Sequence, residues 1–245
     1  MKDFLIVIPA RYKSSRLPGK PLIDLLGKSM ILRTYERCLQ VVSPEDIVVA
    51  TDDTKIYDHC LSHSINVMMT SELCLTGTDR VAEVSRHIDA EYYINVQGDE
   101  PLFNPNDILK IIEAIKANKG KVINGYCPIL NSEDFFSTSI PKVVFRPDGR
   151  LLYMSRSPIP GNKDASFMQA NRQVCVYAFP KIALNEFSEM KTKTHLEMHE
   201  DIEILRFLEL GYEVYMIELS SESIAIDNPH DIEKVITRLL RESNF

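Results

Sequence analysis

The sequence has 245 residues, and the 44% that are hydrophobic suffice for the core of one large domain or of a domain with a substantial lobe. A net charge of −7 at pH 7 argues against a nucleic-acid-binding protein, because the phosphate backbone would repel it overall. No apolar run approaches the length of a membrane span, and the short one at the N-terminus lacks a small-residue cleavage site, so we expect a cytoplasmic protein without membrane contact.

Strand-like and helix-like segments alternate along the first half of the sequence. Apolar stretches, several rich in β-branched residues, predict parallel strands over 4–10, 46–53, 65–70 and 92–101. Apolar residues at helical spacing predict helices over 29–42, 54–64, 78–88 and 107–118. This alternation is typical of an open α/β sheet that is mainly parallel and has helices on both faces.

The pattern changes after Lys121. Strand-like stretches separated by turns predict a smaller antiparallel, β-rich lobe within residues 121–195, with strands in 121–130, 141–156 and 173–179. The remaining elements are expected to be a helix over 199–210, a strand over 212–219 and a closing helix over 228–242. We therefore expect residues 1–245 to form a single domain that includes this lobe.

A basic loop follows the first predicted strand. It carries Arg11, Lys13, Arg16 and Lys20, and Gly19 lets the main chain approach a ligand closely. Ligands of open α/β sheets bind beyond the carboxyl ends of the strands, where cations and main-chain amides together can hold phosphates. The spacing is not that of a Walker A loop, and a solvated basic loop is the alternative interpretation.

Acidic residues follow three other strand-like stretches. Asp52 and Asp53 end one of them, and Asp53 is expected to cap the next helix, whereas Asp52 could be a ligand. Asp99 follows NVQG, and Asp227 follows SIAI. Either of these two carboxylates is well placed for a Mg²⁺ ion that bridges phosphates, although a polar turn and a helix cap are the alternatives. Two such acids facing the basic loop favour metal-assisted transfer at a nucleotide phosphate.

Two other signals carry little weight. The five cysteines are scattered without a Cys-x-x-Cys pair, which predicts reduced thiols and neither a disulfide frame nor a zinc site. His195 and His199 are four residues apart in an expected helix, but HLEMH lacks the Glu that H-E-x-x-H requires directly after its first His.

The chain resembles the family of 3-deoxy-manno-octulosonate cytidylyltransferases, which make CMP-Kdo for lipopolysaccharide. The motifs that carry the resemblance occur in the family's order over essentially the whole chain: PARYKSSRLPGKPL, ATDD, TGTDRVAEV, NVQGDEP, PKVVF, YMSRSPIP and AIDNPHDIEKV. The resemblance implies a Rossmann-like, GT-A-like nucleotidyltransferase fold, CTP as the donor and two Mg²⁺ ions. It also implies a homodimer formed through the β-rich part.

Matching positions in these motifs give each site residue an expected role. The CTP phosphates would be held by Arg11, Arg16 and Lys20. The cytidine would be enclosed by Thr76, Gly77, Thr78, Asp79 and Arg80. The metal would be bound by Asp99 and Asp227, which with Lys20 form the expected catalytic set. The sugar would be contacted by Gln97, Arg156, Tyr177 and Glu203. Gln173 and Glu200 are further candidates for the sugar pocket, for the reasons given next.

Two positions depart from the family's pattern. Gln173 stands where H-x-G-I-Y has His, and Ile204 stands where E-Q-L-R has Gln. A sugar pocket that loses such polar groups is expected to select a changed sugar. Loss of an imidazole that can become cationic, with Glu200 and Glu203 expected on one helical face, favours an ammonium on the substrate. We therefore expect transfer of CMP to 8-amino-3,8-dideoxy-manno-octulosonate (8-amino-Kdo), with ordinary Kdo as the alternative.

More distant alternatives are a glycosyltransferase that uses a nucleotide-sugar and a non-catalytic nucleotide-sensing protein. The segment ATDD contains no D-x-D, and glycosyltransferases do not need a basic loop directly after the first strand. The presence of Lys20, Asp99 and Asp227 argues against a protein without catalysis. A sialic acid cytidylyltransferase would share the basic loop but not the motifs around the two aspartates.

Overall fold

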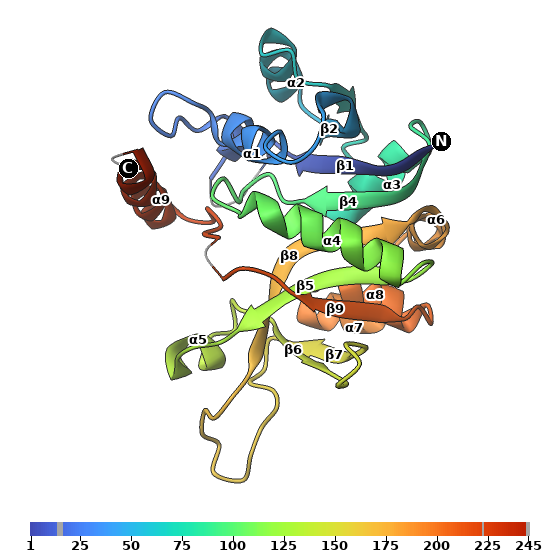
Figure 1. The fold of residues 1–245 in the computed structure, drawn as a ribbon, viewed down its shortest axis with the longest axis vertical. Coiled ribbons are helices and arrows are strands. Elements are labelled where there is room, and N and C mark those ends of the chain that lie inside the picture. The colour runs from blue at the N-terminus through green and yellow to red at the C-terminus, as the bar shows by residue number, and fades with distance from the viewer. Residues whose placement is uncertain (14–16, 222, 244–245) are drawn as a thin grey trace. The chain divides into compact units, whose positions relative to one another are not determined.

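The computed structural model describes residues 1–13, 17–221 and 223–243 (Figure 1). The chain divides into two compact units, Met1–Leu109 with Glu222–Phe245 and Lys110–Ser221. Helix α4 (Pro105–Ala117) contains the point at which the chain passes from the first unit to the second. The expected β-rich stretch, residues 121–195, lies inside the second unit.

Parallel strands form the centre of the first unit. They are β1 (Lys2–Ala10), β2 (Ile47–Thr51), β3 (Val67–Met69) and β4 (Ala90–Val96), in the order β3-β2-β1-β4 (Figure 1). Strand β1 pairs with β2 on one side and with β4 on the other. Its residues 5–10 are all buried, as the continuous apolar run of a strand covered on both faces requires.

Capping side chains set where the helices of the first unit begin. Ser29 accepts a hydrogen bond from the Leu32 amide at the start of α1 (Met30–Cys38), and Asp53 caps α2 (Thr54–Ser62), as predicted. Thr76 and Asp79 form a reciprocal capping box at the start of α3 (Gly77–Ser85). Each capping side chain binds a main-chain amide in the first turn of its own helix, so each loop enters its helix in a fixed direction.

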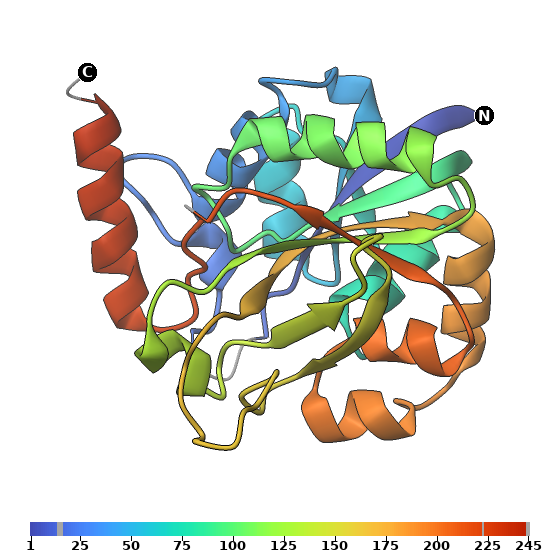
Figure 2. The same cartoon turned by 60° about the horizontal axis from the view of Figure 1, so that its bottom comes forward.

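The last helix, α9 (Pro229–Ser243), belongs to the first unit. Its Val235 and Leu239 pack in an apolar cluster with Leu25 and Met30, residues that follow the short 3₁₀ helix η1 (Lys20–Leu22). Figure 2 shows this last helix in dark red. This packing brings the segment before α9 to the loop after β1, although more than 200 residues separate Lys20 and Asp227 in sequence.

The second unit contains most of the antiparallel structure. Its strands are β5 (Val122–Pro128), β6 (Lys142–Phe145), β7 (Leu151–Ser155), β8 (Asn171–Pro180) and β9 (Val214–Glu218). Strand β8 is antiparallel to β5 and β6, and β6 forms a hairpin with β7, whereas β5 and β9 are parallel. The predicted antiparallel character of this part is therefore confirmed.

The helices of the second unit are α5 (Ser132–Phe136), α6 (Lys181–Glu189), α7 (His195–Glu200) and α8 (Ile204–Glu209). They differ from the expectation, which included neither α5 nor α6 and placed one helix over 199–210. The single helix expected over 199–210 is wrong, because Asp201 adopts a left-handed conformation with φ of 51° and ends α7. Along the described chain, no helix is long and apolar enough to cross a membrane.

A buried ion pair joins α7 and α8. The side chains of Glu197 and Arg206 are both 0% exposed, with Arg206 Nε 2.6 Å from Glu197 Oε2 and Nη2 2.7 Å from Oε1. The guanidinium also lies 3.7 Å from the centre of the Phe187 ring and donates to the Phe187 carbonyl. Both carboxylate oxygens therefore have a cationic donor inside the core.

Candidate active site

Lys20 lies in a cluster of oxygen atoms at the carboxyl-end side of β1 and β4. Its Nζ is 2.6 Å from Asp99 Oδ2, 2.7 Å from the carbonyl oxygen of Ile226 and 3.4 Å from Asp227 Oδ1. The structure thus brings together the three residues expected to form the catalytic set, from three separate stretches of the first unit.

Main-chain hydrogen bonds hold the two acids in place. The Ile226 amide donates to the Asp99 carbonyl oxygen, with an N···O distance of 3.0 Å. Asp231 in the first turn of α9 accepts from the amides of Asp227 and Asn228. Burial raises the pKa of Asp231, but these amides and Lys234 outweigh burial and hold it below its ordinary value. The segment that carries Asp227 is therefore tied to both Asp99 and the helix.

The oxygen set around Lys20 fits a divalent cation. Carboxylates and a main-chain carbonyl are the hard ligands that Mg²⁺ prefers, and one or two protein carboxylates suffice when phosphates complete the shell. The Lys20 ammonium already lies among these oxygens, which identifies the point as one that attracts a cation. Among the described residues no group of three or more His, Cys, Asp or Glu side chains gathers to hold a metal alone. A metal here would therefore depend on ligand oxygens from a bound nucleotide.

Tyr12 and Gly19 shape the basic loop after β1. Gly19 has a φ of 70°, and its amide donates to the Tyr12 carbonyl over 2.9 Å. A Cβ at Gly19 would come within 3.2 Å of the Tyr12 ring, above which Lys55 Nζ lies at 4.6 Å. Arg11 is exposed at the start of this loop, and Arg16 lies outside the described residues.

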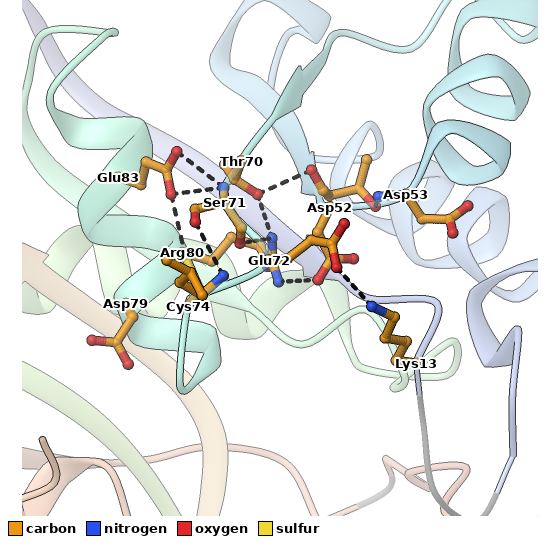
Figure 3. A network of polar contacts seen from close by, with 12 residues as sticks. Lys13, Asp52, Asp53, Thr70, Ser71, Glu72, Cys74, Asp79, Arg80 and Glu83 are labelled. Carbon is orange, nitrogen blue, oxygen red and sulfur yellow. Dashed lines mark hydrogen bonds and ion pairs between the residues drawn. The ribbon is translucent and has the colours of Figure 1, made fainter.

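A second polar network connects the ends of β2 and β3 with α3 (Figure 3). Arg80 is only 3% exposed, and its Nη2 lies 2.8 Å from Asp52 Oδ2. Its Nη1 donates to the Thr70 hydroxyl, which in turn donates to the Thr51 carbonyl. Asp52 is thus paired with a buried arginine and helps to fix the two strand ends relative to α3.

The network continues into the loop after β3. Glu83 accepts from the Ser71 amide and from Cys74 Sγ, while Lys13 Nζ lies 2.6 Å from Glu72 and so links this loop to the one after β1 (Figure 3). Burial, together with the hydrogen bond to Glu83, raises the pKa of Cys74 to about 12, so this thiol stays protonated at neutral pH.

The stretch expected to enclose the cytidine begins in this network. Thr78 is 1% exposed and Arg80 3%, whereas Thr76 and Gly77 are half-buried. The side chains of Thr78 and Arg80 are therefore part of the packed framework. The expected contacts of this stretch with a nucleotide stay a prediction.

Proteins with sequences similar to this chain are named as cytidylyltransferases. The family model described as "Cytidylyltransferase" matches residues 5–221. The 3-deoxy-manno-octulosonate cytidylyltransferase of Protochlamydia amoebophila is 38% identical over 247 residues, which cover 98% of this chain and 95% of the relative. The Escherichia coli protein of the same name is 35% identical, with 99% and 98% covered. The chain belongs to the 3-deoxy-manno-octulosonate cytidylyltransferase family.

Solved structures agree with this membership. A CMP:2-keto-3-deoxy-manno-octonic acid synthetase complexed with CTP matches with a TM-score of 0.91 at 35% identity, covering 98% of this chain and all of that one. A 4-diphosphocytidyl-2C-methyl-D-erythritol synthase from Anaerococcus prevotii matches with a TM-score of 0.66 at 17% identity, covering 98% and 97%. The second match concerns the fold alone. The expected nucleotidyltransferase fold is confirmed.

Gln97 is the one residue of the first unit expected at the sugar of this cytidylyltransferase. It follows β4 directly and is half-buried. The other residues expected there belong to the second unit.

Arg156 and Glu200 are joined by several hydrogen bonds in the second unit. Glu200 accepts from Ser155 Oγ at 2.6 Å, from the Arg156 amide at 2.8 Å and from the Tyr153 hydroxyl at 3.3 Å. Burial raises the pKa of Glu200, but these donors outweigh burial and hold it below its ordinary value. The carboxylate is therefore ionised at neutral pH and already occupied by donors from the protein.

The remaining expected sugar residues are largely internal. Gln173 is 7% exposed and donates to Asn124 Oδ1 over 3.0 Å, and Tyr177 is 6% exposed. The expectation that Glu200 and Glu203 share one helical face is wrong. Glu200 is the last residue of α7, and Glu203 precedes α8, because the left-handed Asp201 separates the two helices.

Gly98 is the residue through which β1 constrains the Asp99 loop. A Cβ at this position would lie 2.9 Å from the Pro9 carbonyl oxygen and 3.3 Å from Ile31 Cδ1. Because the nearest atom belongs to a buried strand's main chain, Gly98→Ala should displace Asp99 and lower kcat/KM for pyrophosphate release by about 10-fold to 100-fold.

Gly161→Ala is the matched control for this substitution. Its Cβ would meet only the Pro158 carbonyl oxygen at 3.9 Å, an ordinary contact, so kcat/KM should not change. A Gly98→Ala enzyme with the kcat/KM of the wild type would contradict the constraint on Asp99.

Proposed function

We propose that this member of the family transfers CMP from CTP to the acidic eight-carbon keto-sugar Kdo, releases pyrophosphate and serves lipopolysaccharide biosynthesis. The observation that carries the proposal is the meeting of Lys20, Asp99 and Asp227 from three distant stretches of chain. The sugar follows from the family, whose members similar to this chain are named for Kdo.

The nucleotide would be held mainly by the loop after β1. Transfer of a nucleotidyl group depends on positioning and on neutralising charge more than on covalent chemistry. Arg11 and Lys20 would bind the β- and γ-phosphates, and Arg16 would add a third cation by resemblance. The anomeric hydroxyl of the sugar would attack the α-phosphorus in line and lose its proton to solvent. The bond between the α-phosphorus and the bridging oxygen breaks, and pyrophosphate would leave toward these cations, which stabilise its developing charge.

Asp99 and Asp227 would hold Mg²⁺. The ion, when bound, neutralises phosphate oxygens and lowers the pKa of the attacking hydroxyl. Lys20 now bridges the two acids, and a phosphate would draw its ammonium away from them. Asp99 and Asp227 would then bind the metal, and Lys20 would bind the triphosphate. The second ion and the homodimer implied by the resemblance stay predictions.

The second candidate substrate is 8-amino-Kdo. It is favoured by Gln173, a neutral and buried amide that stands, by the resemblance, where the family has a His. A pocket without that potential cation repels an ammonium less. The Glu200 carboxylate, however, is engaged by Ser155, Tyr153 and Arg156, so it adds less to this candidate than its charge alone would.

A substrate panel read by pyrophosphate release tests the proposal. With Mg²⁺ and CTP, kcat/KM should be at least about 100-fold higher for an octulosonate than for sialic acid, because a site built for particular polar groups rejects analogues strongly. Release should stop when the metal is chelated. A higher kcat/KM for Kdo than for 8-amino-Kdo would remove the second candidate, and the reverse would select it.

Two outcomes of the panel would contradict the proposal. One is that CTP yields no pyrophosphate with Kdo and none with 8-amino-Kdo. The other is turnover of a nucleotide-sugar without pyrophosphate release, which would indicate a glycosyltransferase.

A further inference from the structure

Lys142, the first residue of β6, is a buried cation in the second unit. Lys142 is 0% exposed, and its Nζ donates to three main-chain carbonyl oxygens. They belong to Ser137 at 2.8 Å, Ile140 at 2.7 Å and Arg156 at 2.6 Å. An ammonium has three N–H groups, so each of them has an acceptor.

A charge in this position is costly. Burial and the nearby Arg156 lower the pKa of Lys142, and Glu200 opposes them. The next residue, Val143, is part of the apolar core, and an apolar side chain at 142 would avoid the desolvation of an ammonium. The ammonium donates a hydrogen bond to each of three main-chain carbonyl groups, which an apolar side chain could not do. One of these carbonyl groups belongs to Arg156.

Arg156 is fixed from other directions as well. Its guanidinium donates through Nε to the Glu200 carbonyl at 2.5 Å, through Nη1 to the Thr138 carbonyl at 3.0 Å and through Nη2 to the Asp201 carbonyl at 3.1 Å. A guanidinium has five N–H donors, so these bonds leave one on each terminal nitrogen. Such a pair matches the two oxygens of a carboxylate, the group that distinguishes an acidic sugar.

We propose that Lys142 is a positioning residue that acts through Arg156 on the carboxylate of the sugar substrate. By holding the Arg156 carbonyl and the 137–140 turn, Lys142 keeps the main chain and the Thr138 carbonyl in place, so that the guanidinium keeps one orientation. This inference rests on the proposed function, because it requires an acidic sugar as the acceptor.

A double-mutant cycle tests the inference. Lys142→Met should raise KM for Kdo about 10-fold to 100-fold, because a small misplacement of a substrate-positioning group is costly. KM for CTP should stay within about twofold, since the nucleotide is held elsewhere. In an Arg156→Ala background, the same substitution should change KM for Kdo by less than about twofold, since no guanidinium is left to misplace.

Controls separate positioning from folding. Lys191→Met removes an exposed lysine of the same unit and should leave both KM values unchanged. If Lys142→Met does not fold, Lys142→Gln keeps two N–H donors for the carbonyls and allows the same cycle. A rise in KM for Kdo that is equal in both backgrounds, or a parallel rise in KM for CTP, would overturn this inference alone. Absence of turnover by the wild type would overturn the proposed function and this inference with it.

Discussion

Asp99→Asn is expected to lower kcat at least about 10³-fold while leaving the fold intact. The amide has the shape of the carboxylate but not its charge, so it would bind neither the Lys20 ammonium, now 2.6 Å away, nor a divalent cation with the same strength. Metal ions supply several kcal/mol of transition-state stabilisation, and each 1.36 kcal/mol changes the rate tenfold. Pyrophosphate release at saturating CTP, Kdo and Mg²⁺ measures the effect.

The matched control for this prediction is Asp58→Asn, which removes an exposed acid of the same unit on α2. It should turn over like the wild type. Circular dichroism and the thermal midpoint should be unchanged in both variants. Near-normal turnover by Asp99→Asn would refute the assignment of Asp99 to the metal.

Arg206→Met is expected to lower the free energy of unfolding by about 3–5 kcal/mol, because it leaves the Glu197 carboxylate buried without its cation. Both side chains are 0% exposed, so water cannot replace the lost donors. The substitution also removes the contact with the Phe187 ring. Urea unfolding followed by far-ultraviolet circular dichroism measures the loss.

Two comparisons decide whether the buried charge is the cause. Adding Glu197→Gln to Arg206→Met removes the stranded charge and should restore part of the lost stability. Lys28→Met breaks an exposed pair with Glu36, also at 2.6 Å, and should cost under about 1 kcal/mol. A loss below that value for Arg206→Met would show that the pair between α7 and α8 contributes no more than a surface pair.

The sequence predicted the strands of the first unit well, for a physical reason. A strand covered on both faces must be apolar throughout, and residues 4–10 display that pattern without help from distant residues. The cap at Asp53 is equally local, because the carboxylate and the amide it accepts from are two residues apart. The rule that ligands lie beyond strand carboxyl ends then placed Asp99 near the basic loop.

Other features depended on contacts that the sequence does not display. Helical spacing continues through 199–210, so nothing in the periodicity indicated that Asp201 turns left-handed and separates Glu200 from Glu203. A lysine at the start of a strand usually exposes its ammonium to solvent. Lys142 is buried because the carbonyl groups of a turn surround it, and carbonyl groups leave no trace in side-chain patterns.

The packing of α9 on Leu25 and Met30 has a consequence for the order of events during biosynthesis. Asp227 is held beside Lys20 by residues that the ribosome adds after the basic loop and after Asp99. A nascent polypeptide grown as far as Ser221 would already have the basic loop and Asp99, but it would lack the second acid. If transfer needs both acids, as proposed, activity would begin only after this later segment has emerged and packed against Leu25 and Met30.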